Sequence, residues 1–181
     1  TGYPVPENLF DALRVNSNID RFSWIVDDYL VLEQALGGIS KNDGVDYGLS
    51  YKPNSSTEIF AYVRYILPNS DASTKEIKRG DIFTGVNGTQ LTISNYQSLL
   101  SLENYTVNLA TYNGTTFVSN GKSVALTKTV LAENPIYINK VIESGSHKIG
   151  YLMYNGFYAA YDTQLNDAFG SLKAQGITDL V

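Results

Sequence analysis

Apolar residues in the first forty positions recur every three or four residues, as they do along one face of a helix. The run from Pro6 to Leu13 predicts a first helix, because proline is favoured in the first turn. A second helix is predicted by the spacing of Phe22, Ile25, Tyr29 and Leu32. It should end near Leu36, where Gly37 follows. Residues 1–43 are therefore expected to form a helical segment that is too short to bury a core alone.

From about Gly44 the pattern changes to short stretches rich in β-branched and aromatic residues, separated by Asn, Gly, Ser and Pro. The predicted strands are Tyr47–Tyr51, Ile59–Ile66, Ile82–Val86, Thr106–Tyr112 and Lys122–Val130. Helical spacing within Ser94–Leu102 predicts one short helix between the third and fourth strands. Residues 44–131 are therefore expected to form one compact β domain.

The last third has the pattern of a strand, a helix and a second strand. Lys148–Tyr154 is an apolar run whose side chains would point to both faces of a sheet, so we expect both faces to be covered. A helix is predicted from Asp162 or Thr163 to Gly176, and Ile177–Val181 begins a strand parallel to the first. Residues 132–181 are expected to open an α/β domain that continues further, since one such unit cannot cover both faces of its sheet.

Composition excludes several classes of function. The 181 residues are 43% hydrophobic and 17% charged, which is typical of a globular chain with a real core. With a net charge of −5 and scattered Lys and Arg, no nucleic-acid partner is expected. No apolar run approaches the roughly 18–20 residues of a transmembrane segment. The chain has no cysteine and one histidine, His147, which we interpret as a surface loop residue; no metal and no cofactor are expected.

The stretch Ile77–Gly88, IKRGDIFTGVNG, places a short strand between two turn signals. Gly80 permits a positive φ in the first turn, and the Asn87-Gly88 pair is typical of a type I′ hairpin turn. Upstream, the residues after Leu67 predict a loop that runs into a short helical turn. The predicted order is strand, loop, short helix, turn, strand and hairpin.

This order resembles a PDZ domain in the circularly permuted form found in the C-terminal-processing (tail-specific) serine protease family. The family's usual run, V-x-x-P-x-S-P-A-x-x-A-G-[IL]-x-x-G-D-x-I-x-x-[IV]-N-G, is similar to Leu67–Ala72, Ile77, Gly80–Ile82 and Val86–Gly88. It differs at Asp71, where the family often has proline, and at Glu76, where it often has glycine.

Two other stretches follow the order of the same family. Asp20–Ile25, DRFSWI, resembles the element D-R-[FY]-[ST]-x-[IL] that precedes the PDZ domain, and Lys148–Leu152, KIGYL, resembles the start of the catalytic domain. The resemblance implies an α+β fold and the N-terminal portion of a serine endopeptidase of the bacterial periplasm or cell envelope. Its Ser/Lys dyad, in which a desolvated lysine accepts the serine proton, is expected beyond Val181. This chain alone is therefore expected to be inactive, with no catalytic residue.

The resemblance also implies a site for protein or peptide substrates. In PDZ domains an extended peptide adds to a sheet as a strand, and backbone N–H groups hold its C-terminal carboxylate. The corresponding residues here are Tyr47, Gly48, Leu49, Ser50 and Tyr51, and the helix residues Tyr96, Leu99 and Leu100 would line the pocket for the last peptide side chain. The alternatives are a strand without a ligand, a non-catalytic peptide- or protein-binding module at the cell envelope, and a structural cell-surface protein whose β domain is rich in tyrosine.

Overall fold

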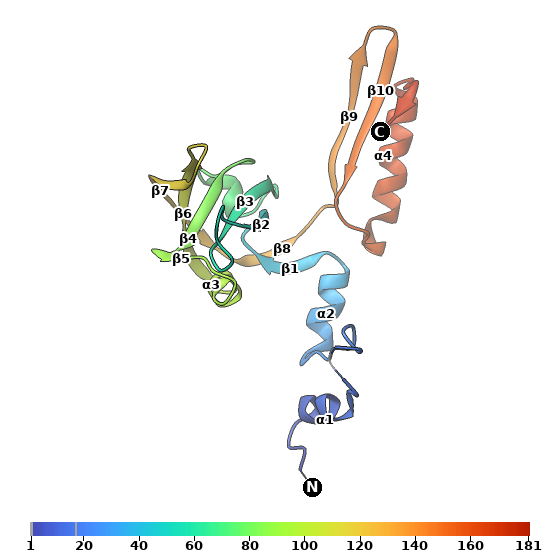
Figure 1. Ribbon diagram of the computed structural model, residues 1–181. Coiled ribbons are helices and arrows are strands. Elements are labelled where there is room, and N and C mark those ends of the chain that lie inside the picture. The colour runs from blue at the N-terminus through green and yellow to red at the C-terminus, as the bar shows by residue number, and fades with distance from the viewer. Residues whose placement is uncertain (1, 17) are drawn as a thin grey trace.

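The computed structural model of the protein describes residues 2–16 and 18–181, which form three parts (Figure 1). Two short helices lead from the N-terminus to a two-stranded sheet of β1 (Ile39–Asn42) and β8 (Thr129–Ala132). A six-stranded sheet lies on one side of this pair, and a hairpin with a long helix lies on the other. The mixture of helices and several sheets confirms the predicted α+β class.

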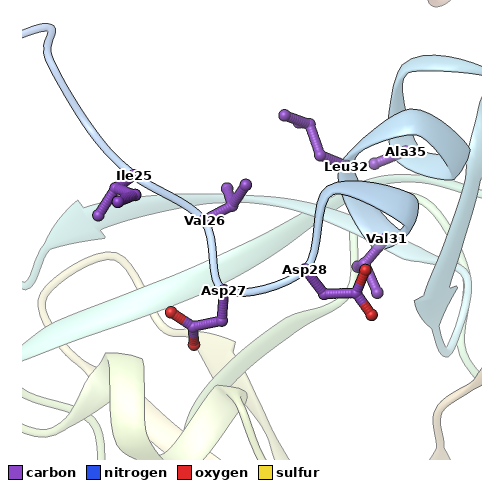
Figure 2. A pocket seen from close by; sticks show the side chains of 7 residues that line it. All are labelled: Ile25, Val26, Asp27, Asp28, Val31, Leu32 and Ala35. Atoms are coloured by element: carbon purple, nitrogen blue, oxygen red, sulfur yellow. The ribbon is translucent and has the colours of Figure 1, made fainter. Parts of the chain in front are cut away.

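The N-terminal helices are α1 (Pro6–Leu13) and α2 (Tyr29–Leu36), and neither contains a buried residue. The prediction that the second helix begins near Phe22 is wrong, because residues 21–28 are not helical. Asp28 caps α2 instead: its Oδ1 accepts a hydrogen bond from the Leu30 backbone N–H at 2.8 Å. The first turn of α2 borders a shallow hollow of about 520 Å³, lined by Ile25, Val26, Asp27, Asp28, Val31, Leu32 and Ala35 (Figure 2).

The six-stranded sheet is antiparallel throughout. In spatial order its main strands are β2 (Val45–Tyr51), β3 (Ile59–Ile66), β4 (Ile82–Val86), β6 (Asn104–Tyr112) and β7 (Phe117–Thr127), and β5 (Thr89–Gln90) pairs with β4. Strands β3 and β4 have the predicted bounds. The predicted strand Lys122–Val130 is divided between β7 and β8, which belong to different sheets. The expected short helix is α3 (Tyr96–Leu100), and a 3-10 turn, η1 (Ala72–Thr74), follows β3.

The turns around β4 form as the sequence predicts. Gly80 has φ of 89°, and the Asp81 N–H donates to the Lys78 carbonyl at 3.0 Å. Asn87 and Gly88 both have positive φ, 52° and 78°, as a type I′ turn requires, and they connect β4 to β5. The register of β4 is therefore fixed at both ends.

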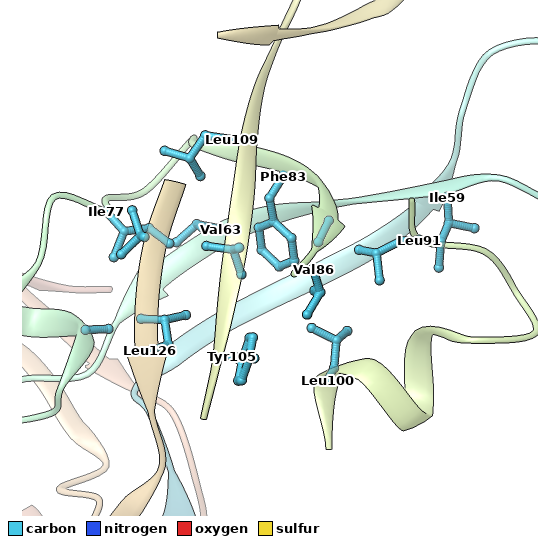
Figure 3. Close-up of a cluster of buried hydrophobic side chains, with 14 residues drawn as sticks. Ile59, Val63, Ile77, Phe83, Val86, Leu91, Leu100, Tyr105, Leu109 and Leu126 are labelled. Atoms are coloured by element: carbon cyan, nitrogen blue, oxygen red, sulfur yellow. The ribbon is translucent and has the colours of Figure 1, made fainter. Parts of the chain in front are cut away.

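The hydrophobic core lies between this sheet, α3 and the loop that contains η1 (Figure 3). Its buried residues come from β3, β4, β6 and β7, together with α3 and the loops: Ile59, Ala61, Val63, Ala72, Ile77, Phe83, Val86, Leu91, Leu100, Tyr105, Val107, Leu109, Val124 and Leu126. Phe83 is 1% exposed, and burial of a side chain of this size stabilises the fold by about 1.5–3 kcal/mol.

The third part consists of β9 (Ile136–Ser144), β10 (His147–Tyr154), η2 (Ala159–Tyr161), α4 (Asp162–Ala174) and β11 (Asp179–Leu180). β11 pairs with β10 in parallel, which confirms the predicted strand, helix and strand unit. β9 was not predicted; it forms an antiparallel hairpin with β10. Gly150 is the buried residue of β10 and lies beside Leu172 of α4; coverage of both faces of this strand stays a prediction. Asp162 begins α4 rather than capping it, and its carboxylate lies in the favourable first turn.

Within residues 2–16 and 18–181, no helix has both the length and the apolar character needed to cross a membrane.

Candidate peptide-binding edge

β2 occupies one end of the six-stranded sheet. In the described part of the chain it pairs with β3 along one edge only. The other edge therefore presents backbone N–H and C=O groups that an added strand could use. Such an edge is the structural requirement for binding an extended peptide by strand addition.

The pairing with β3 decides which face each predicted site residue occupies. The register pairs Tyr47 with Val63, Gly48 with Tyr62, Leu49 with Ala61, Ser50 with Phe60 and Tyr51 with Ile59. Residues directly opposite each other share a face of the sheet. The partners of Tyr47 and Leu49 are core residues, so these two lie on the core face, whereas Gly48 and Ser50 lie on the outer face. Tyr51, the last residue of β2, is 55% exposed and lines the same hollow as Ser50.

Tyr47 and two residues of α3 form the core-face side of the candidate site. The Tyr47 ring packs edge-on against Phe83 with 5.9 Å between centroids, and Tyr96 and Leu99 pack half-buried against the same core. Burial raises the pKa of the Tyr47 hydroxyl, with further contributions from nearby Asp43, Asp46 and Tyr96, so this hydroxyl stays neutral. Leu100 is 5% exposed and belongs to the core, which leaves Tyr96 and Leu99 as the α3 residues that a ligand could contact.

Gly48 has a packing reason to be glycine. A Cβ atom at this position would lie 2.4 Å from the Tyr62 ring, which covers the outer face of β2 there. Any other residue would displace that ring. The small size of Gly48 thus serves the contact between β2 and β3.

A buried acid, which the sequence did not single out, fixes the start of β2. Asp43 is 4% exposed; its Oδ2 accepts a hydrogen bond from the Tyr105 hydroxyl at 2.7 Å, and its Oδ1 accepts one from the Val45 N–H at 3.0 Å. The Ala72 N–H donates to the Asp43 carbonyl at 2.9 Å. Asp43 therefore joins β2 to β6 and to η1. The only sequence signal was the turn pattern Asn42-Asp43-Gly44, which does not reveal burial.

The six-stranded sheet meets the hairpin of β9 and β10 beside β3. The rings of Tyr65 and Tyr137 lie 5.1 Å apart, and the Tyr137 hydroxyl donates to the Ile66 carbonyl at 3.2 Å. A hollow of about 710 Å³ at this junction is lined by Asp46, Tyr62, Val63, Arg64, Tyr65, Arg79, Gly80, Met153, Tyr154 and Asn155. The strand next to β2 is thus also the strand that contacts the third part of the chain.

Other candidate chemistry is sparse. Among the residues whose structure is described, no three His, Asp or Glu side chains are grouped to hold a metal ion. His147 lies at the exposed tip of the hairpin, where its Nδ1 is 2.9 Å from Oδ2 of Asp179. This pair connects β10 to β11.

Comparison with known proteins gives matches among solved structures. No family model and no curated protein matches the chain. The crystal structure of a protein from Bacteroides fragilis NCTC 9343, named as an S41 protease, superposes with a TM-score of 0.64 at 23% identity and covers 98% of this chain and 46% of that chain. The photosystem II D1 C-terminal processing protease superposes with a TM-score of 0.51 at 18% identity, over 98% of this chain and 49% of that chain.

The fold is that of these proteases. The resemblance indicated by the three sequence motifs is thereby confirmed at the level of the fold. This chain spans about half the length of each of the two structures.

Proposed function

We propose that this chain is the N-terminal and PDZ-like portion of a serine endopeptidase that resembles C-terminal-processing proteases. The observation that carries the proposal is the order of the three motifs along a chain of which 98% superposes on two proteases. The Ser/Lys dyad would lie in a part of the enzyme outside these 181 residues. Cleavage would therefore require that part, and the PDZ-like domain would bind substrate C-termini or gate the active site.

In this proposal the substrate adds to the open edge of β2 as an extra strand. Its main chain would pair with β2, its terminal carboxylate would meet backbone N–H groups near Gly48, and its last side chain would lie against Tyr47, Tyr96 and Leu99. Two acids lie near this end of β2, but both already have partners: Asp43 is bound by Tyr105, and Asp46 pairs with Arg64. Their partners reduce the repulsion that a carboxylate would meet.

Gating would use the junction beside β3. A peptide on β2 would extend the sheet that carries Tyr65, and the Tyr65 ring contacts the Tyr137 ring at the start of the third part. Binding at the edge of the sheet could therefore change the orientation of the part that resembles the opening of the catalytic domain. Such an enzyme is expected in the periplasm or cell envelope, and cell fractionation tests that location.

Fluorescence anisotropy with labelled ten-residue peptides that end in an apolar residue tests whether this chain binds the C-terminal carboxylate of a peptide. We expect the free acid to bind at least about tenfold more tightly than the amide, since the amide lacks the charge that the N–H groups stabilise. Leu99→Asp should abolish binding, whereas Val130→Asp, at a 74% exposed position on β8, should not. Equal affinity for acid and amide would refute carboxylate capture.

A peptidase assay tests the location of the chemistry. We expect no turnover by residues 1–181 and turnover by the complete gene product. Turnover by the 181-residue chain alone would refute the assignment of catalysis to residues outside it.

A further inference from the structure

Aromatic side chains gather on the outer face of the six-stranded sheet, opposite the core. They line a hollow of about 450 Å³ formed by Ser50, Tyr51, Pro53, Phe60, Ile82, Tyr112 and Phe117, which we call the aromatic patch. The Phe117 ring lies 4.3 Å from that of Phe60 and 5.0 Å from that of Tyr112, between centroids. No charged residue lines this hollow.

The patch is unexpected on this face. An antiparallel sheet with one face on the core commonly presents polar side chains on the other face. Here β3, β6 and β7 each contribute an aromatic ring instead, although the core on the opposite face is already closed by buried side chains. Tyr112 is 44% exposed, and Phe60 and Phe117 are partly exposed. The rings therefore present an apolar surface that the core does not require.

The patch is continuous with the open edge of β2. Ser50 lines it and lies directly opposite Phe60, so a small side chain separates the rings from the free edge. A peptide residue opposite Ser50 would point to the same face, because directly opposite residues share a face. Two strand spacings, roughly 10 Å, separate such a peptide from β3. A ligand ring and the Phe60 ring, each leaning over Ser50, would meet across that distance.

We propose that the peptide edge selects substrates with an aromatic or large apolar side chain at the fourth position from the C-terminus, bound by the aromatic patch. The inference rests on the proposed function, since it uses the same strand addition. If the last side chain lies opposite Tyr47 on the core face, the antiparallel order places the third from the end opposite Leu49 and the fourth opposite Ser50. Specificity would then come from both faces of one edge strand.

The test compares ten-residue free-acid peptides that carry Phe, Leu or Ser fourth from the end, with Phe third from the end as a control for the face. Phe at the fourth position should bind about tenfold more tightly than Ser, which corresponds to about 1.4 kcal/mol. Phe117→Ser should remove this gain and leave the affinity of the Ser peptide unchanged. Tyr112→Ser provides a second, more exposed variant, and Val118→Ser, 43% exposed and outside the lining of the patch, is the matched control.

Each outcome decides one of the two proposals. If no free-acid peptide binds, the proposed function fails and this inference fails with it. If the peptides bind but Phe at the fourth position gives no gain, or the gain survives Phe117→Ser, the inference alone is overturned. It is also overturned if sedimentation shows a dimer that Phe117→Ser converts to a monomer, because a second copy would then cover the patch.

Discussion

Removal of one hydroxyl tests whether Asp43 fixes the start of β2. Tyr105→Phe keeps the ring in the core but deletes the hydrogen bond of 2.7 Å to Asp43 Oδ2. Asp43 is 4% exposed, so water cannot readily replace the lost donor. Because hydrogen bonds to charged groups contribute about 1.5–3 kcal/mol, we expect the free energy of unfolding to fall by about 2 kcal/mol.

Urea denaturation followed by circular dichroism measures this loss at an unchanged m-value. At about 2–4 °C per kcal/mol for a chain of this size, Tm should fall by roughly 4–8 °C. Tyr112→Phe is the matched control: its hydroxyl donates to the Gly114 carbonyl at 3.0 Å on an exposed turn. It should cost less than about 0.5 kcal/mol. Equal effects of the two substitutions would refute the assignment of Asp43 as a buried anchor.

The same variant has a signature at high pH. Burial, followed by the Asp43 carboxylate, raises the pKa of Tyr105 above its ordinary value of 10.0. Since the folded pKa is raised, the unfolded chain releases this proton first, so the contribution is intact below about pH 10 and declines as pH rises further. Tyr105→Phe should show a shallower alkaline loss of stability than the wild type. An identical slope would mean that Tyr105 titrates normally.

Two further substitutions and one pH experiment test other contacts. Gly48→Ala should push aside the tip of the Tyr62 ring, which is 40% exposed and can move, so it should cost less than about 1 kcal/mol in urea denaturation, and this cost should disappear in a Tyr62→Ala background. Tyr137→Phe removes the hydroxyl bond to β3 and should cost about 0.5–1.5 kcal/mol, with a larger radius of gyration in X-ray scattering if this bond orients the two parts. Hydrogen bonds from Thr178 and then His147 lower the pKa of Asp179, so the pairing of β11 with β10 should weaken only as pH falls below about 3.8. The protection of the Val181 amide against hydrogen exchange measures this pairing, because that N–H donates to the Gly150 carbonyl. A loss of protection already at pH 5 would contradict the prediction.

Sequence reasoning succeeded where local signals agreed with each other. β3 and β4 are bounded by turn residues and rich in β-branched and aromatic residues. The turn signals and the strand propensity therefore predicted the same first and last residue for each strand. It failed for α2 because apolar spacing continues through Phe22 and Ile25 without helical structure, and the cap at Asp28 sets the boundary. β9 was missed although a turn around Gly145 links two suitable runs, a hairpin signal that the sequence contained.

The candidate site was less predictable than the fold. The motif resemblance located β2 and α3, but it treated Tyr47 to Tyr51 as one set, whereas strand alternation divides them between two faces. Which face is which depends on pairing with β3, and the register shift between Asp46 and Tyr47 could not be read from one sequence. Burial of Asp43 and Leu100 is likewise a tertiary property.

The Asp43 anchor gives a physical reason why the edge of β2 would suit the proposed peptide. An edge strand free to move would lose conformational entropy when a peptide pairs with it, and that loss would weaken binding. Here the first residues of β2 are tied to β6 through Tyr105 and to η1 through Ala72, while Leu49 and Tyr51 remain at least one-third exposed. The strand is thus held at the end where the carboxylate would bind and is accessible along the rest. If anchoring of β2 by Asp43 assists peptide binding, Tyr105→Phe should weaken peptide binding more than Tyr112→Phe even at temperatures where both variants are fully folded.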